Sequence, residues 1–186
     1  MNYEEAADYI KQTGVALNVS LISEEILAIP QFHVWSGSAH KHQHHYGKHG
    51  LCIHTAEVIK LCLGNNKLLS AGICDNHLFL AGLFHDLGKM WDYVPIDKDL
   101  TEWEGAAHKR HIHHISRSAI MWHDVAHKHG VDEDDILHAI LAHHGQREWG
   151  SPVSPNTKLA WMLHLCDSIS ARMYDAETWD HVKKEQ

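Results

Sequence analysis

The sequence feature that most constrains the fold is an apolar stretch that runs directly into a histidine and an aspartate. Residues 78–84 read Leu-Phe-Leu-Ala-Gly-Leu-Phe, which indicates a buried helix, and His85 and Asp86 follow at once. A carboxylate in such a segment needs a partner, because desolvating an unpaired charge costs several kcal/mol. Two partners are open: Lys89, one helical turn later on the face of Asp86, or a bound cation.

Length and composition indicate one folded domain. The chain has 186 residues, of which 44% are hydrophobic, and a chain of this size can bury a substantial core. We expect a single domain over residues 1–186, with the helices of residues 1–35 packed on it and a polar tail over residues 176–186. No apolar run approaches the length of a membrane span, so we expect no membrane partner.

The cysteine pattern and the net charge limit the cellular location and the classes of binding partner that we expect. The four cysteines form no Cys-x-x-Cys pair, so we expect reduced thiols in a cytoplasmic protein. A formal net charge of −8 argues against a broad nucleic-acid surface and against stable binding to duplex DNA. Phosphate-bearing substrates remain compatible with this charge, because bound cations supply local positive charge.

Apolar residues with a helical period predict an all-α domain of six to seven helices. The expected helices cover residues 2–13, 23–29, 51–63, 76–90, 106–128, 132–144 and 157–174. Two strand-like fragments between residues 91 and 105 predict a small β-hairpin. Residues 31–50 and 145–156 have the composition of loops.

Histidine is unusually frequent, with 21 copies spread along the chain. Several imidazoles and two carboxylates fall in apolar helical segments, where a shared cation would satisfy them together. These candidate metal ligands are His54, His85, Asp86, His111, His143, His144 and Asp167.

Two of these assignments have open alternatives. His108 and His114 compete with His111, because they lie near the same helical face. His143 and His144 point about 100° apart on a helix, so both can face one site only where the helix ends. Gly145 makes such an end plausible.

The order of these residues resembles the metal-binding signature of the HD-domain phosphohydrolase superfamily. The resemblance rests on His54, on the doublet His85-Asp86 followed by Leu-Gly-Lys, and on Asp167. It extends from about residue 44 to residue 175. His111 and the pair His143-His144 resemble the additional ligands of the two-metal members.

Several short sequence segments are most similar to the HD domain of bacterial 3′-to-5′ exoribonucleases. The segments that carry this similarity are His44-His45, Gly50-Leu-Cys-Ile-His54-Thr, His-His-Gly-Gln-Arg-Glu-Trp-Gly-Ser-Pro from residue 143, and Leu-His-Leu-Cys-Asp167. On this resemblance, His45 or His44 would line the mouth of the pocket.

The resemblance implies that the ligands form two metal sites. One metal would be held by His54, His85, Asp86 and Asp167, and a second by Asp86 together with His111, His143 and His144. Mixed nitrogen and oxygen ligands favour Mn, Fe, Zn or Co over Ca or Mg. Two such ions can share a hydroxide nucleophile and neutralise a phosphoryl oxygen during in-line attack.

Catalytic and substrate-binding roles follow for a few further residues. Asp86 would bridge the two metals, and Lys89 would contact substrate phosphate or orient Asp86. Arg147 and Trp149, just after His144, could contact a phosphate and stack a base. A simple packing role for Trp149 is the open alternative.

Together these observations predict a metal-dependent phosphohydrolase or phosphodiesterase, of the two-metal type by resemblance, that acts on a nucleotide or a short oligonucleotide. A mononuclear nucleotidase that uses only His54, His85, Asp86 and Asp167 is the alternative among enzymes. A non-enzymatic module that binds metal or nucleotide is the alternative from another class.

Overall fold

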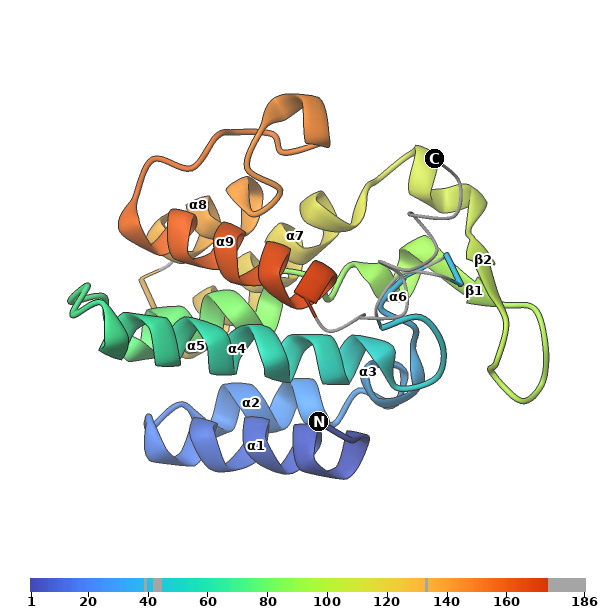
Figure 1. Ribbon diagram of the computed structural model, residues 1–186, viewed down its shortest axis with the longest axis horizontal. Coiled ribbons are helices and arrows are strands. Elements are labelled where there is room, and N and C mark those ends of the chain that lie inside the picture. The colour runs from blue at the N-terminus through green and yellow to red at the C-terminus, as the bar shows by residue number, and fades with distance from the viewer. Residues whose placement is uncertain (39, 42–44, 133, 174–186) are drawn as a thin grey trace.

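Two long helices, α4 (Gly50–Leu68) and α9 (Lys158–Met173), pack against each other at the centre of the molecule (Figure 1). The buried helix α5 (Asp75–Phe84) contacts both of them. α8 (Asp134–Ala142) packs against α5 and α9, and α7 (His114–His129) packs against α5 and α8. Helices from distant parts of the sequence therefore meet around one centre.

The structure is a computed structural model that describes residues 1–38, 40–41, 45–132 and 134–173. Its other elements are α1 (Tyr3–Ala16), α2 (Ser20–Leu27), α3 (Pro30–Val34), α6 (Lys89–Asp92), β1 (Tyr93–Pro95), β2 (Trp103–Gly105) and the 3₁₀ helices η1 (Ala107–Arg110) and η2 (Arg147–Trp149). α1 and α3 pack on α4, and α2 contacts both α1 and α3. The tail expected over residues 176–186 lies outside the described residues, as does His44.

The core is built around α5, whose residues from Leu78 to Phe84 are all buried. A helix that is apolar on every side is stable only when other elements surround it. Gly82 permits the close approach of α4, because a Cβ atom there would lie 2.8 Å from Cγ1 of Ile59. On the opposite side, the ring of Phe84 packs edge-on against the buried Trp122 of α7.

The expected all-α fold with a small hairpin is confirmed. β1 and β2 pair in antiparallel register, with Tyr93 opposite Gly105 and Pro95 opposite Trp103. Within the described ranges, no helix is both long and apolar enough to cross a bilayer.

The single helix expected over residues 76–90 is wrong, because the chain turns between α5 and α6. The backbone N–H of Gly88 donates to Oγ of Ser118 on α7 over 2.8 Å, in place of the helical carbonyl four residues earlier. A Cβ atom at Gly88 would lie 2.1 Å from the carbonyl oxygen of His114. This close backbone contact between the turn and α7 presents His85 and Asp86 at the end of α5.

Other helix boundaries also differ from the expectation. The helix expected over residues 106–128 is divided into η1 and α7, and α7 begins only at His114. Its first residue is held by Asp92, whose Oδ2 accepts from the backbone N–H and from Nδ1 of His114. α4 continues through Gly64 instead of ending there, and α3 begins at Pro30, a residue suited to the first helical turn.

Candidate metal centre

Four ligand-type side chains, from α4, from the turn that follows α5 and from α9, converge at the centre of the fold. Nε2 of His54 lies 3.2 Å from Oδ2 of Asp86 and 3.1 Å from Oδ1 of Asp167. Nε2 of His85 lies 3.4 Å from the same Asp86 oxygen and 3.8 Å from the same Asp167 oxygen. Ligand atoms that share an ion at about 2.1 Å are themselves about 3–4 Å apart. We call His54, His85, Asp86 and Asp167 the first ligand group.

Three further histidines form a second ligand group, His114, His143 and His144, beside the first. Nε2 of His114 lies 3.3 Å from Nε2 of His144. The second oxygen of Asp86, Oδ1, lies 3.5 Å from Nε2 of His114 and 3.6 Å from Nε2 of His143. Asp86 therefore directs one oxygen toward each group.

The hydrogen bonds of the outer ring nitrogens determine which nitrogen carries the lone pair. Nδ1 of His85 contacts the carbonyl of Gly82 at 2.8 Å, and Nδ1 of His143 contacts the carbonyl of Ile140 at 2.7 Å. A carbonyl only accepts, so each Nδ1 must carry the proton. In the neutral ring, the lone pair on Nε2 then points into the centre, as in histidine metal ligands.

The remaining members of the second group are fixed in the same way. Nδ1 of His144 donates to the carbonyl of Trp149 over 2.8 Å. Nδ1 of His114 donates to Oδ2 of the buried Asp92 over 2.9 Å. Burial raises the pKa of Asp92 to about 6. Because this value is still below neutral pH, the carboxylate is ionised at pH 7 and accepts the bond.

This arrangement fits a divalent cation. The lone pairs of His114 and His144 face each other, which is unfavourable unless a proton or a cation lies between them. Oδ1 of Asp86 and Nε2 of His143 are both buried, and neither has a hydrogen-bond partner among the described residues. Buried polar atoms are rarely left unpaired, and imidazole with carboxylate is a donor set for transition metals.

Burial keeps most of these imidazoles neutral. It lowers the pKa of His85 and of His114, and it lowers the pKa of His144 to about 4. Burial also lowers the pKa of His54, but hydrogen bonds to Asp167 and Asp86 outweigh this effect and raise it overall. A bound cation would replace the proton that His54 shares with these carboxylates.

The carboxylates of the first group are held in the ionised form. Burial opposes the ionisation of Asp86, but the neighbouring Lys89 ammonium outweighs it and holds the pKa well below its usual range. Burial also opposes the ionisation of Asp167, but its hydrogen bond with His54 lowers the pKa. Ionised carboxylates and neutral imidazoles are the protonation states that bind metal ions.

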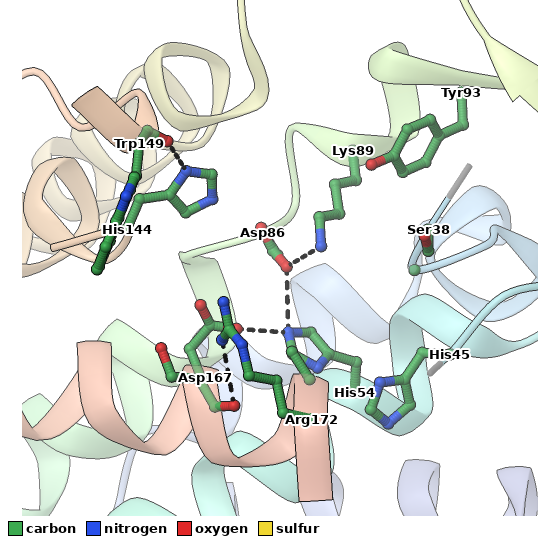
Figure 2. Close-up of a pocket in the computed structure, with 13 residues that line it drawn as sticks. Ser38, His45, His54, Asp86, Lys89, Tyr93, His144, Trp149, Asp167 and Arg172 are labelled. Carbon is green, nitrogen blue, oxygen red and sulfur yellow. Dashed lines mark hydrogen bonds and ion pairs between the residues drawn. The ribbon is translucent and has the colours of Figure 1, made fainter. Parts of the chain in front are cut away.

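Lys89 is one of the two partners that the sequence offered for the buried carboxylate of Asp86. Its Nζ lies 2.5 Å from Oδ2 of Asp86, so the two residues form an ion pair (Figure 2). Burial opposes the charge on Lys89, but the neighbouring Asp86 raises its pKa overall. Asp86 is thus paired with Lys89 and also faces the imidazoles of both ligand groups.

A cavity of about 330 Å³ opens directly onto this centre. His54, Asp86 and Asp167 form part of its lining, and Lys89 reaches the same space (Figure 2). The lining also includes Ser38, His45, Tyr93, Trp149 and Arg172. The ligand-type atoms are therefore accessible to a small substrate.

One predicted ligand, His111, is not brought to the centre. It is exposed in the turn after η1, whereas His114 is buried and belongs to the second ligand group. The physical reason is the late start of α7, since Asp92 holds His114 as its first residue. The competing assignment to His114 is the one that agrees with this geometry.

The predicted substrate-binding residues line the cavity, with the exception of Arg147. His45 and Trp149 line the cavity, and Trp149 is 58% exposed. Arg147 is exposed on η2 and is not part of the lining.

The lining residues that sequence reasoning missed include Ser38, Tyr93 and Arg172. Arg172 lies one helical turn after Ser168, another lining residue beside Asp167, and this period could have indicated it. Ser38 and Tyr93 enter through loop and strand contacts that carry no sequence pattern.

Comparisons with known proteins identify relatives of this chain. A family model described as the HD domain matches residues 52–172. The 3'-5' exoribonuclease YhaM of Bacillus pumilus (strain SAFR-032) is 34% identical over 146 residues, which cover 75% of this chain and 44% of that protein. The protein of that name from Bacillus subtilis (strain 168) is 33% identical over 135 residues, which cover 70% of this chain and 41% of that protein.

The chain thus spans less than half the length of these relatives. A search of solved structures gave no significant match. The family and the relatives support the expected metal-dependent hydrolase, and they confirm the resemblance noted in the sequence. The chain belongs to the HD-domain family.

Proposed function

We propose that this chain is a metal-dependent phosphodiesterase that hydrolyses the terminal phosphodiester of short single-stranded RNA. The observation that carries the proposal is the position of Asp86, whose two oxygens face two separate groups of imidazole nitrogens at the floor of an open cavity. Such a centre can hold two cations that share one carboxylate. The names of the relatives, 3'-5' exoribonucleases, support RNA as the substrate and the 3′ end as the point of attack.

The proposed metal ligands are the two groups defined above. His54, His85, Asp86 and Asp167 would hold one ion, and Asp86, His114, His143 and His144 would hold the other. The mixed donor set favours Mn, Fe, Zn or Co. Divalent ions at these positions would activate water for attack on phosphorus and would offset the negative charge of the phosphoryl oxygens.

The side chains at the cavity wall would bind and orient the substrate. Lys89 uses one N–H on Asp86, and its ammonium has further donors for a phosphoryl oxygen. Arg172 provides a second cation at the wall. The exposed ring of Trp149 offers a surface on which a base can stack.

The segment that carries Trp149 is hydrogen-bonded to the second ligand group. The backbone carbonyl of Trp149 accepts the hydrogen bond from Nδ1 of His144. Substrate contact and ligand orientation therefore depend on the same short segment. A base stacked on Trp149 would lie close to the second ligand group.

Hydrolysis of a 5′-labelled single-stranded oligoribonucleotide with added manganese tests the proposal. Wild-type protein should shorten the RNA from its 3′ end, and EDTA should abolish the reaction until manganese is restored. Asp86→Asn should remove detectable hydrolysis, whereas Asp99→Asn, at an exposed carboxylate outside the cavity lining, should not. Binding of both metal and RNA without turnover would contradict the enzyme and favour a binding module.

The mononuclear alternative is separated by metal content. Elemental analysis of the purified protein should give two ions per chain for the proposed centre and one for a site formed by the first ligand group alone. We also propose a cytoplasmic location. The cysteines in the described ranges are free thiols, which supports it.

A further inference from the structure

A buried carboxylate outside both ligand groups lies directly behind the centre. Glu57 is on α4, three residues after His54, and only 5% of its surface is exposed. A buried carboxylate is retained only where it is paired or hydrogen-bonded. Its Oε2 accepts a hydrogen bond from Oγ of Ser170 over 3.1 Å and contacts Nε2 of His45 at 2.8 Å.

Ser170 connects this carboxylate to a predicted metal ligand. It is fully buried on α9, three residues after Asp167, and its Oγ lies 3.1 Å from Nδ1 of His54. A hydroxyl has one proton, and here it is donated to Glu57. Ser170 must therefore accept from Nδ1–H of His54, which leaves Nε2 of His54, facing Asp86 and Asp167, as the nitrogen at which a cation can replace the shared proton.

The same carboxylate also contacts the wall of the cavity through His45. The backbone of His45 has a positive φ of 67° and is enclosed by two glycines. The N–H of Gly37 donates to the His45 carbonyl over 2.9 Å, and a Cβ atom at Gly50 would lie 1.8 Å from that oxygen. This segment holds the His45 ring against Glu57, with its centroid 4.8 Å from that of His54.

We propose that Glu57 is a positioning residue that acts through Ser170 on His54 and through direct contact on His45. Its hydrogen bonds keep the proton on Nδ1 of His54, so that Nε2 is free to bind the metal. They also join the orientation of this ligand to the orientation of the cavity wall. The inference rests on the proposed function only in requiring a cation at the first ligand group.

Zinc affinity, measured for the full chain by competition with a chromophoric chelator, tests this role. Ser170→Ala breaks the connection while leaving Glu57 and all ligands in place, and it should weaken zinc binding by about 10–100-fold, as loss of a partner of a histidine ligand generally does. Ser23→Ala is the matched control, because it removes an equally buried serine hydroxyl on α2 and should leave the affinity unchanged.

Variants of Glu57 separate hydrogen bonding from a general packing effect. Glu57→Ala should weaken zinc binding, and Glu57→Gln, which keeps an acceptor oxygen, should recover a large part of the loss. In the zinc-loaded protein, the NMR signal of the proton on Nδ1 of His54 should be present in wild type and absent or broadened in Ser170→Ala. Thermal unfolding of each metal-free variant confirms that the chain is folded.

Unchanged zinc affinity in folded Ser170→Ala and Glu57→Ala would overturn the proposal, even if the wild type binds two ions. Equal losses in Glu57→Ala and Glu57→Gln would overturn the hydrogen-bonding role. Failure of the wild type to bind zinc is a separate result, which would contradict the metal centre itself.

Discussion

The carboxylate of Asp92 accepts a hydrogen bond from the ring of His114, with 2.9 Å between Oδ2 and Nδ1. Because the same oxygen also accepts from the backbone N–H of His114, it fixes both the start of α7 and the orientation of the imidazole. One contact therefore accounts for the presence of His114, and not His111, in the second ligand group.

Replacing Asp92 should weaken the second ion selectively. Asp92→Asn keeps the shape of the side chain but removes the charge that holds Nδ1–H, so we expect about a tenfold loss of affinity for the weaker-bound ion. Calorimetric titration of manganese into the metal-free protein measures both binding steps. Asp99→Asn serves as the exposed control, and an equal loss at both steps would contradict a selective effect.

His114 and His111 provide a direct test of the revised assignment. His114→Ala should reduce the metal content from two ions per chain to one, because it removes a buried ligand of the second group. His111→Ala, three residues earlier and exposed, should leave two ions. Elemental analysis of both variants decides between them, and loss of an ion from His111→Ala alone would reverse the assignment.

The turn between α5 and α6 should tolerate no side chain at Gly88. A Cβ atom there would lie 2.1 Å from a backbone oxygen of α7, which cannot move as a flexible side chain would. We expect Gly88→Ala to destabilise the fold by about 1–3 kcal/mol. Urea denaturation of the metal-free protein measures this change.

Gly64 provides the opposite control for that substitution. It lies in α4 with nothing within 4 Å of its virtual Cβ position. Gly64→Ala should stabilise the chain by about 0.5–1 kcal/mol, because alanine is the better helix former. Equal effects of the two substitutions would argue against the close contact between the turn and α7.

Trp149 should contribute to RNA binding without affecting the metals. Removing a stacked aromatic ring costs about 1–3 kcal/mol per base, so Trp149→Ala should raise the KM for RNA by about 5–150-fold. The backbone carbonyl that holds His144 is retained, so the metal content should stay the same. Trp161→Ala, which removes an exposed ring outside the cavity lining, is the control. An unchanged KM in Trp149→Ala would favour a packing role.

The sequence was informative where function and burial coincide in one segment. The apolar run from Leu78 to Phe84 predicted a buried helix, and the structure surrounds it with α4, α7, α8 and α9. His54 and Asp167 were singled out because they interrupt apolar helical faces, and the structure brings both to Asp86. The burial predictions depended on local periodicity, and the grouping of His54 and Asp167 with Asp86 depended also on the resemblance to the HD-domain superfamily.

Predictions that depended on distant contacts were less successful. The break after α5 follows from a bond between Gly88 and Ser118, and the start of α7 follows from Asp92, which is 22 positions before His114. Neither contact leaves a local pattern. Gly64 indicated a helix end, yet α4 continues past it, because packing of the buried face outweighs the weak propensity of one glycine.

We propose that Asp86 lies between two metal ions, and anomalous diffraction from crystals of the zinc- or manganese-loaded protein would locate these ions. We expect two anomalous peaks near the Asp86 carboxylate, one among His54, His85 and Asp167 and the other among His114, His143 and His144. Loaded crystals with no peak beside Asp86, and with its carboxylate in contact with Lys89 alone, would contradict it.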